Sequence, residues 1–352
     1  MSHVLFTGGG SAGHVVPTYE LINVLRRRGV RISFVGSNSG LEEGLLAGLD
    51  VDYYGLASGK LRRYLSFVNL LDGFRVVGAI WQAYWLLGRL RPDVVFSKGG
   101  FVSFPVVLAA WLRTIPVIAH ESDLTPGLAN RLAMPFVKTL CINFPATPTG
   151  RFRGRVVHTG TPLRDALTNA DAATGRRMLE VADVDRILLI TGGSLGSDVL
   201  NEAVREALPD LTADYVVVHV CGPGKVAAVE NRRYRQFEYV TDGWGDILAA
   251  ADLVVSRAGA NTLYELLALG KPNLLVPLSR HASRGDQIEN AAFAAALGYS
   301  RVLAEETLNR ESLLTQIRAL DGELVEARER LASFVIPDSV GLICAELDRY
   351  LP

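Results

Sequence analysis

The sequence of 352 residues contains only three cysteines, Cys141, Cys221 and Cys344, without a Cys-x-x-Cys pair or a zinc-ligand spacing. This odd and scattered set argues against a disulfide framework and favours a reducing compartment. The sequence also lacks an excess of charge of either sign, because it contains 36 Lys and Arg and 37 Asp and Glu. A net charge of −1 gives no global attraction to polyanions, so we expect no nucleic-acid partner.

Long hydrophobic runs are absent as well. The longest, 76–88 and 101–112, are shorter than the roughly 20 residues that cross a bilayer. The first ten residues lack a basic segment followed by an apolar one, so no signal peptide is expected. Charge is unevenly spread, however: residues 1–160 hold 17 Lys and Arg against 9 Asp and Glu, and residues 161–352 hold 19 against 28. This asymmetry predicts that the first half meets an anionic surface.

Short β-branched runs alternate with helical patterns, which indicates an α/β fold with parallel, doubly wound sheets. The expected strands are 3–7, 31–35, 93–96, 116–119, 186–191, 215–220, 253–256 and 273–277. Similar glycine-rich loops, TGGGSAG at Thr7 and TGGSLGS at Thr191, follow the first strand of each half. They predict two Rossmann-like domains, 1–160 and 161–338, joined by a linker within 143–162. A last helix, 339–352, is expected to pack back on the first domain.

The first glycine loop matches G-x-G-x-x-G through Gly8, Gly10 and Gly13. A dinucleotide-binding domain would also carry an acidic residue at the end of the second strand, and residues 35–38 contain none. A nicotinamide cofactor is therefore disfavoured, and a tight turn without a ligand remains an alternative. His14 follows the loop directly, where an imidazole can accept a proton near neutral pH.

The second glycine loop, 192–196, also matches the G-x-S-x-G pattern of a serine hydrolase, with Ser194 as the nucleophile. The short signal lacks an accompanying oxyanion motif, so we favour a phosphate-binding loop that uses backbone amides. A helix expected to begin at Asn261 or Thr262 would point its positive end at a diphosphate. Glu265, one turn inside this helix, could accept two ribose hydroxyls or merely complement the helix dipole.

Further polar residues follow other expected strands. Asp286 and Gln287 lie where a ligand crevice forms in α/β sheets, although a solvated helix start would look the same. In the first half, Gly99, Gly100 and Phe101 follow one strand, and the carboxylates Glu121 and Asp123 follow the next. Their spacing is not convincing for a metal site.

The segment 60–91 combines basic and aromatic residues. The basic members include Arg62, Arg63 and Arg75, and the aromatic ones Phe74, Trp81 and Trp85. Trp81 and Trp85 share one helix face because they are four residues apart. Basic residues flanking aromatics are typical of a segment that lies on anionic lipid, and an ordinary core helix is the alternative.

Seven motifs, taken in order, resemble the MurG family of bacterial UDP-N-acetylglucosamine transferases. They are GGGSAGHVVP, SKGGFVSFP, HESDLTPGLAN, GTPLR, GGSLGS, SRAGANTLYE and DQIENA. The resemblance implies a GT-B fold with two domains facing a cleft. It implies inverting transfer of N-acetylglucosamine from UDP-N-acetylglucosamine to the C4 hydroxyl of lipid I, which forms lipid II. It also implies that neither a cofactor nor a metal is required.

The resemblance also assigns roles by position. The diphosphate would meet Ser194 and Arg164, the backbone near Thr241 would read uracil, and Glu265 would hold the ribose. The remaining donor-side residues would be Ser11, Gly13, Asn130, Ala260, Asp286 and Gln287. The acceptor side would use Gly99, Gly100 and Phe101, and the candidate bases are His14, Glu121 and Asp123.

Several residues depart from the family pattern: Ser11, Phe101, Asp123 and Asp286 replace commoner residue types. These departures leave the reaction class intact and leave the identity of the base open. A peripheral protein on the cytoplasmic face of the membrane is implied, with cell-wall and division proteins as candidate partners. Alternatives are a UDP-sugar 2-epimerase, a glycolipid transferase, or a silent UDP-binding member of a cell-wall assembly.

Overall fold

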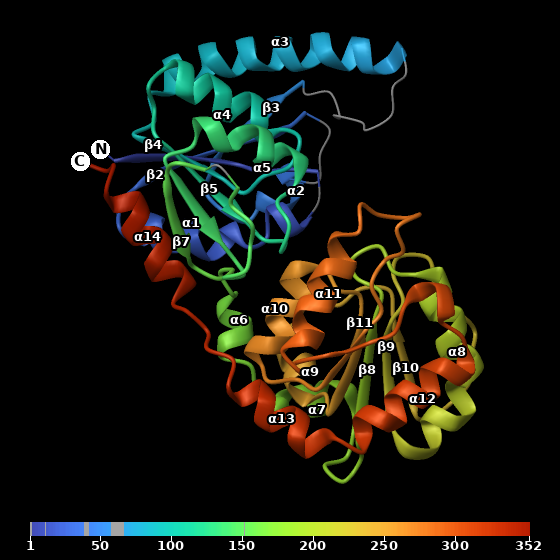
Figure 1. The fold of residues 1–352 in the computed structure, drawn as a ribbon. Coiled ribbons are helices and arrows are strands. Elements are labelled where there is room, and N and C mark those ends of the chain that lie inside the picture. The colour runs from blue at the N-terminus through green and yellow to red at the C-terminus, as the bar shows by residue number, and fades with distance from the viewer. Residues whose placement is uncertain (1, 11, 39–41, 58–66, 151) are drawn as a thin grey trace. The chain divides into compact units, whose positions relative to one another are not determined.

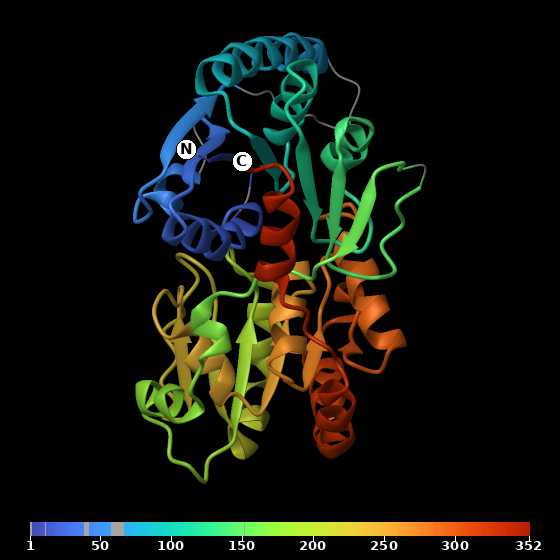
Figure 2. The same cartoon turned by 90° about the vertical axis from the view of Figure 1, so that its left-hand side faces the viewer.

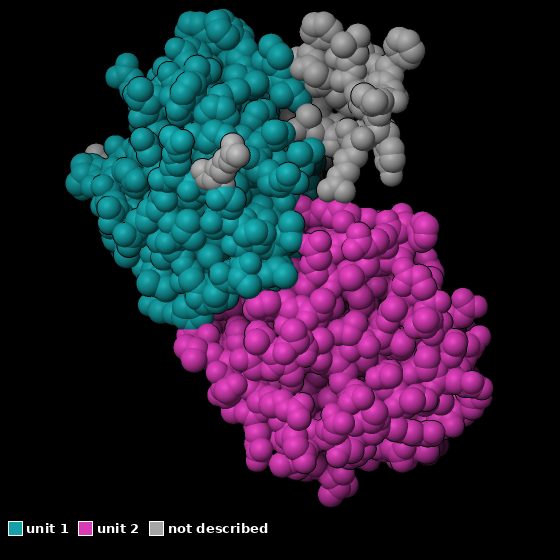
Figure 3. Space-filling view, in the orientation of Figure 1, with its two compact units in different colours: residues 1–162, 337–352 teal, residues 163–336 magenta. Residues whose placement is uncertain are grey.

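The structure is a computed structural model that describes all residues except 1, 11, 39–41, 58–66 and 151, and only the backbone of residues 12 and 67–74. The chain divides into two compact units, coloured separately in Figure 3. Unit 1 comprises Met1–Pro162 together with Pro337–Pro352, and unit 2 comprises Leu163–Ile336. Each unit contains a parallel sheet with helices packed on it (Figure 1), which confirms the expected fold class.

Unit 1 is built on a seven-stranded sheet in the order β3-β2-β1-β4-β5-β6-β7. Its strands are β1 (His3–Thr7), β2 (Arg31–Ser37), β3 (Asp52–Leu56), β4 (Val94–Ser97), β5 (Val117–Glu121), β6 (Thr139–Ile142) and β7 (Arg155–His158). Its α-helices are α1 (Thr18–Arg27), α2 (Glu42–Leu46), α3 (Phe67–Leu90), α4 (Ser103–Leu112), α5 (Leu128–Ala133) and α14 (Ser339–Asp348), and its 3-10 helices are η1 (Ala12–His14) and η2 (Met134–Phe136).

The central strand β1 shows why this sheet is covered on both faces. Val4 and Phe6 point into a core shared with α1 and α14, whereas Leu5 points into a second core shared with α3 and α4. All three side chains have no exposed surface. Successive side chains of a strand point to opposite faces, so a strand buried on both sides becomes a continuous apolar run.

The helix α14 completes the first of these cores although it comes from the far end of the chain. Ile343 and Leu347 are fully buried there, and α14 lies beside α1 in Figures 1 and 2. Arg28, the C-cap of α1, and Asp348 form an ion pair at 2.5 Å. The buried carboxylate of Glu346 also accepts from Arg155 Nε of β7 at 2.8 Å.

Unit 2 has a six-stranded parallel sheet in the order β10-β9-β8-β11-β12-β13. Its strands are β8 (Ile187–Thr191), β9 (Val216–Val220), β10 (Tyr234–Phe237), β11 (Leu253–Ser256), β12 (Asn273–Leu275) and β13 (Arg301–Val302). Its helices are α6 (Asp165–Thr168), α7 (Ala172–Leu179), α8 (Asp198–Asp214), α9 (Trp244–Ala250), α10 (Ala260–Ala268), α11 (Asp286–Ala296), α12 (Arg310–Asp321) and α13 (Leu324–Ala332), with the 3-10 helix η3 (Glu305–Thr307).

Both sheets reverse their strand order at one place, between β1 and β4 in unit 1 and between β8 and β11 in unit 2. The loops that leave two such strands run in opposite directions and open a crevice at their carboxyl ends, which is where ligands bind in open α/β sheets. The two glycine-rich loops follow β1 and β8. Each unit therefore has a candidate site at the same topological position.

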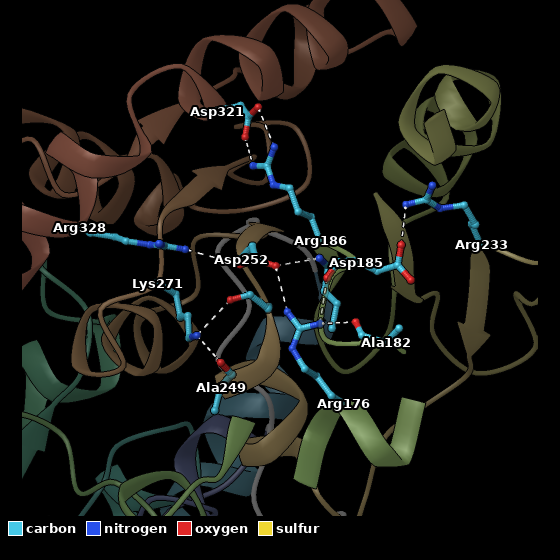
Figure 4. Close-up of polar contacts among 12 residues, drawn as sticks. Arg176, Ala182, Asp185, Arg186, Arg233, Ala249, Asp252, Lys271, Asp321 and Arg328 are labelled. Carbon is cyan, nitrogen blue, oxygen red and sulfur yellow. Dashed lines mark hydrogen bonds and ion pairs between the residues drawn. The ribbon is translucent and has the colours of Figure 1, made fainter. Parts of the chain in front are cut away.

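A cluster of charged residues lies at the amino ends of the strands in unit 2, opposite the glycine loop, and is drawn in Figure 4. Asp252, just before β11, accepts from the backbone N–H of Ile187 at 2.9 Å and pairs with Arg176 and Arg328, each at 3.5 Å. Lys271 donates to the carbonyl groups of Ala249 and Ala251 at the end of α9. The cluster ties α7, α9 and α13 to the amino ends of the strands, so it serves the fold rather than the crevice.

Two local expectations were wrong. The supposed linker 143–162 contains β7, which pairs with β6 as the last strand of the sheet in unit 1. The helix α10 begins at Ala260 with Gly259 as its N-cap, so neither Asn261 nor Thr262 caps it. Within the part of the chain that the structure describes, no helix is long and apolar enough to cross a membrane.

Candidate functional site

In unit 1, His14 ends the short helix η1 that follows the first glycine loop. Its Nδ1 lies 3.2 Å from the carbonyl oxygen of Lys98, at the end of β4. A carbonyl can only accept, so Nδ1 carries the hydrogen and the neutral ring has its lone pair on Nε2. This tautomer suits a base that takes a proton at Nε2.

The first glycine loop is itself held by a carboxylate that sequence reasoning missed. Glu42, the first residue of α2, accepts from the backbone N–H of Gly10 at 2.7 Å and is 2% exposed. It lies five residues beyond the end of β2, outside the 35–38 segment in which an acidic residue was sought. In the sequence, Glu42 and Glu43 look like ordinary acidic residues at the start of a helix. Nothing in that pattern indicates that Glu42 contacts the glycine loop.

The loop after β4 packs directly on the glycine loop. A Cβ added to Gly100 would lie 2.0 Å from the carbonyl oxygen of Gly9, and Gly100 has a φ of +89°, so this position requires glycine. The preceding Lys98 is 2% exposed, and its Nζ donates to His120 Nδ1 at 2.7 Å and to Ser122 Oγ at 2.6 Å. Burial lowers the pKa of Lys98 to about 7. Lys98 thus links the loops after β1, β4 and β5.

The loop after β5 is organised by Glu121, which is 4% exposed. Its carboxylate accepts from the backbone N–H groups of Asp123 and Gly127, each at 3.0 Å, and from Asn130 Nδ2 at 2.8 Å. Burial, together with the charge of Asp123, raises the pKa of Glu121. Both oxygens of Glu121 hold the loop in place, while Asp123 is only partly buried.

The other unit 1 residues named from the sequence lie nearby or on α3. Gly13 belongs to η1, Gly99 is buried at the β4 loop beside Asn130, and Phe101 is half-buried against Gly10. Ser11, Arg62 and Arg63 lie outside the described residues, as does the side chain of Phe74.

The helix α3 lies over α4 in Figure 1, and its described part carries apolar side chains on its buried and on its exposed face. Ala79, Ala83 and Leu87 are buried against unit 1, but Trp81 and Trp85 are 63% and 60% exposed. Their indole rings meet edge to face with centroids 5.8 Å apart. The exposed side is flanked by Arg75 and Arg89, which are themselves exposed. Large exposed apolar groups in contact with each other mark a surface that binds something.

In unit 2, Glu265 lies on α10, one turn from the helix start. Its Oε2 accepts from Trp244 Nε1 at 3.4 Å. Burial raises the pKa of Glu265, and the nearby charge of Arg164 acts in the opposite direction. A carboxylate can accept hydrogen bonds from the hydroxyls of a ligand, and a neighbouring arginine can donate to its phosphates.

The remaining unit 2 candidates lie in loops or helix starts that follow strands of the sheet. Ser194 is exposed in the second glycine loop, and Ala260 is the first residue of α10. At the start of α11, Gln287 Oε1 accepts from the backbone N–H of Leu278 at 3.1 Å, and Asp286 forms an ion pair with Arg284 at 3.1 Å.

Thr241 is exposed after β10 and lines a hollow of about 220 Å³. The other residues that line it are Met178, Leu179, Phe237, Tyr239, Val240, Asp242 and Ile247. The hollow therefore lies between the segment after β10 and the helices α7 and α9.

A buried ion pair, also missed from the sequence, fastens these loops to each other. Arg257 is 6% exposed and donates to the Ser197 hydroxyl at 2.5 Å, to the Val276 carbonyl at 3.0 Å and to Glu305. Glu305 also accepts from the backbone N–H of Ser279 at 2.9 Å. The pair joins the loops after β8, β11, β12 and β13.

Two family models cover most of the chain. The glycosyltransferase family 28 N-terminal domain matches residues 4–142, and the C-terminal domain of the same family matches residues 187–333. A Clostridium kluyveri protein named UDP-N-acetylglucosamine--N-acetylmuramyl-(pentapeptide) pyrophosphoryl-undecaprenol N-acetylglucosamine transferase is 45% identical, over 99% of this chain and 100% of its own. A protein of the same name from Lachnospira eligens is 49% identical over 91% of each chain.

Among solved structures, the crystal structure of Acinetobacter baumannii MurG matches with a TM-score of 0.80 and 27% identity, over 99% of this chain and 100% of that one. The chain belongs to the MurG family. The resemblance carried by the seven sequence motifs is thereby confirmed, and so is the GT-B fold class. The chain is accordingly a glycosyltransferase.

Proposed function

We propose that this chain transfers N-acetylglucosamine from UDP-N-acetylglucosamine to the C4 hydroxyl of lipid I, forming lipid II. The observation that carries the proposal is the 45% identity, over essentially the whole length of both chains, to a transferase of that name. Both candidate sites lie in matched regions, since His14 falls within 4–142 and Glu265 within 187–333.

The UDP part of the donor is assigned to unit 2, and Ser11, Gly13 and Asn130 of unit 1 keep the donor-side role that the resemblance gives them. Glu265 accepts the two ribose hydroxyls, and backbone N–H groups at the start of α10 and in the second glycine loop bind the diphosphate. Arg164 lies close enough to Glu265 for its charge to oppose the rise in the Glu265 pKa. The segment at Thr241 binds the uracil through its backbone, and Gln287 and Asp286 bind the N-acetylglucosamine of the donor.

The acceptor and the base are assigned to unit 1. His14 Nε2 takes the proton from the C4 hydroxyl as that oxygen bonds to the anomeric carbon of the donor. The bond between this carbon and the phosphate oxygen breaks, and UDP leaves with its electron pair. The configuration inverts because the nucleophile enters opposite the leaving group. His14 is preferred over Glu121, because both Glu121 oxygens already accept hydrogen bonds within the loop.

The leaving diphosphate is stabilised by amides and by Arg164, so transfer is expected to proceed without a divalent cation. Fixed dipoles aimed at developing charge are effective in such a role. The described residues hold no group of three or more His, Cys, Asp or Glu side chains suited to a metal ion. Metal independence remains a prediction that chelation tests directly.

Contact with the membrane is assigned to the exposed face of α3. Trp81 and Trp85 would enter the interface between headgroups and acyl chains, and Arg75 and Arg89 would meet anionic headgroups. The acceptor is lipid-linked, and we propose a peripheral position on the cytoplasmic face of the membrane. Proteins of the cell-wall and division machinery are the expected neighbours there.

The test is transfer of radiolabel from UDP-N-acetylglucosamine to a short-chain lipid I analogue in the presence of EDTA. The proposal predicts labelled lipid product and an equal amount of UDP. Donor binding without transfer would point to another acceptor. Conversion of the donor to its 2-epimer without any acceptor would replace the transferase by an epimerase.

A further inference from the structure

The buried carboxylate of Glu42 contacts the first glycine loop, although Glu42 belongs to none of the sequence motifs. Its Oε1 accepts from the backbone N–H of Gly10 at 2.7 Å, and its Oε2 accepts from Ser37 Oγ at 3.2 Å. Ser37 is the last residue of β2 and is itself buried. Glu42 therefore connects the end of β2 to the glycine loop that follows β1.

Gly9 packs closely between this carboxylate and the loop after β4. A Cβ added to Gly9 would lie 2.4 Å from Glu42 Oε1, and one added to Gly100 would lie 2.0 Å from the Gly9 carbonyl oxygen. Gly9 is thus held between Glu42 on one side and the β4 loop on the other. The Gly10 amide, which a phosphate would use in a nucleotide-binding loop, is already occupied by a carboxylate.

The same amide is four residues before His14. Past it, η1 begins at Ala12, and the imidazole donates from Nδ1 to the Lys98 carbonyl at 3.2 Å. Glu42 therefore holds Gly10, and Lys98 contacts the His14 ring. Loss of Glu42 would leave the contact to Lys98 and remove the hydrogen bond that fixes Gly10.

We propose that Glu42 is a positioning residue for His14, holding the first glycine loop so that Nε2 is aimed at the acceptor hydroxyl. The proposal rests on the proposed function, in which His14 is the base. It assigns the first glycine loop to orientation of the base and not to binding of a phosphate. A displacement of about 1 Å at a reacting group can cost a hundredfold in rate, so loss of the anchor should act on turnover.

Three variants separate the contributions. Glu42→Ala removes both hydrogen bonds and is expected to lower kcat at least tenfold, with the KM for UDP-N-acetylglucosamine within twofold, because the UDP part of the donor is bound by unit 2. Glu42→Gln keeps an oxygen that can accept from Gly10 and should restore kcat to within threefold of the parent. The matched control is Glu43→Ala, which removes the exposed neighbouring carboxylate and should change neither parameter.

Glu42→Asp provides a second route if Glu42→Ala does not fold. It keeps the charge but is one methylene shorter, so it should lower kcat while the thermal unfolding midpoint shows that the protein is folded. Parental kcat in a folded Glu42→Ala or Glu42→Asp protein would overturn the proposal. A failure of Glu42→Gln to recover activity would also overturn it, because the hydrogen bond would then not be the cause.

A double-mutant cycle distinguishes positioning of the base from a general structural role. If Glu42 acts through His14, Glu42→Ala should change kcat by less than twofold in a His14→Ala background. A tenfold loss in that background would overturn the role of Glu42 and leave His14 as the base. A change below tenfold in His14→Ala alone would instead refute His14 as the base, and the positioning role would be refuted with it.

Discussion

The strongest test of the donor site is replacement of Glu265. Its carboxylate is proposed to accept from two ribose hydroxyls, and each charge-assisted hydrogen bond contributes about 1.5 kcal/mol. Loss of both in Glu265→Ala should then cost about 3 kcal/mol, or roughly a hundredfold in the Kd for UDP. Glu265→Gln keeps one neutral acceptor and should weaken binding about tenfold. Glu326→Ala, which removes an exposed carboxylate on α13, is the matched control.

The raised pKa of Glu265 adds a dependence on pH. Burial favours the protonated carboxyl, so as the pH falls the accepting carboxylate is lost at a higher pH than for an ordinary glutamate. UDP affinity should therefore decline with acidification in the parent and change less in Glu265→Gln, whose amide does not titrate. Isothermal titration calorimetry at several pH values measures both effects.

The ligand can be changed in the same way as the protein. The parent should bind 2′-deoxy-UDP more weakly than UDP, because one ribose hydroxyl is missing, and Glu265→Ala should bind the two alike. If Glu265→Ala binds UDP within twofold of the parent, the carboxylate does not contact the ribose. If Glu265→Ala still binds UDP more tightly than 2′-deoxy-UDP, another residue contacts the 2′-hydroxyl.

Three further predictions concern the base, the membrane and the fold. His14→Ala should lower kcat about a hundredfold with an unchanged donor KM, measured by UDP release, and a loss below tenfold would move the base elsewhere. Trp81→Ser combined with Trp85→Ser should abolish co-sedimentation with anionic vesicles while sparing UDP binding, and undiminished co-sedimentation would refute the contact through α3. Burial lowers the pKa of His219 to about 3 from 6.5. Between these values the unfolded chain binds a proton that the native chain does not, so His219 should cost about 1.4 kcal/mol of unfolding free energy per pH unit as the pH falls. Urea unfolding of the parent and of His219→Gln between pH 7.5 and 5 should diverge accordingly, and parallel pH profiles would refute this assignment.

Much of the fold could be predicted because its strongest signals are local. The apolar runs at 3–7 and 186–191 and the glycines that follow them are adjacent in sequence, and both regions form strands, at His3–Thr7 and Ile187–Thr191. Five strands were missed: β3, β6, β7, β10 and β13. β3, β7 and β10 are partly exposed, and β13 has only two residues, so none of these four shows a continuous apolar run. β6 is fully buried but only four residues long.

The site was harder to predict where its parts come from distant segments. His14 and Glu265 could be named as candidates because they stand beside a glycine loop and a helix start, and their roles stay predictions. Glu42 reaches its loop across 32 residues, and Arg257 reaches Glu305 across 48, so only the folded chain brings these pairs together. The carboxylate missing from 35–38 does exist at the loop, but it is supplied by the next helix.

The return of α14 to unit 1 sets an order for folding during synthesis. Unit 2 is continuous in sequence from Leu163 to Ile336, so it can close its core as soon as it leaves the ribosome. Unit 1 cannot, because Ile343 and Leu347 fill a core begun by Val4 and Phe6 and are translated last. Until α14 is synthesised, the apolar residues of α1 and β1 that it covers remain exposed on the nascent chain.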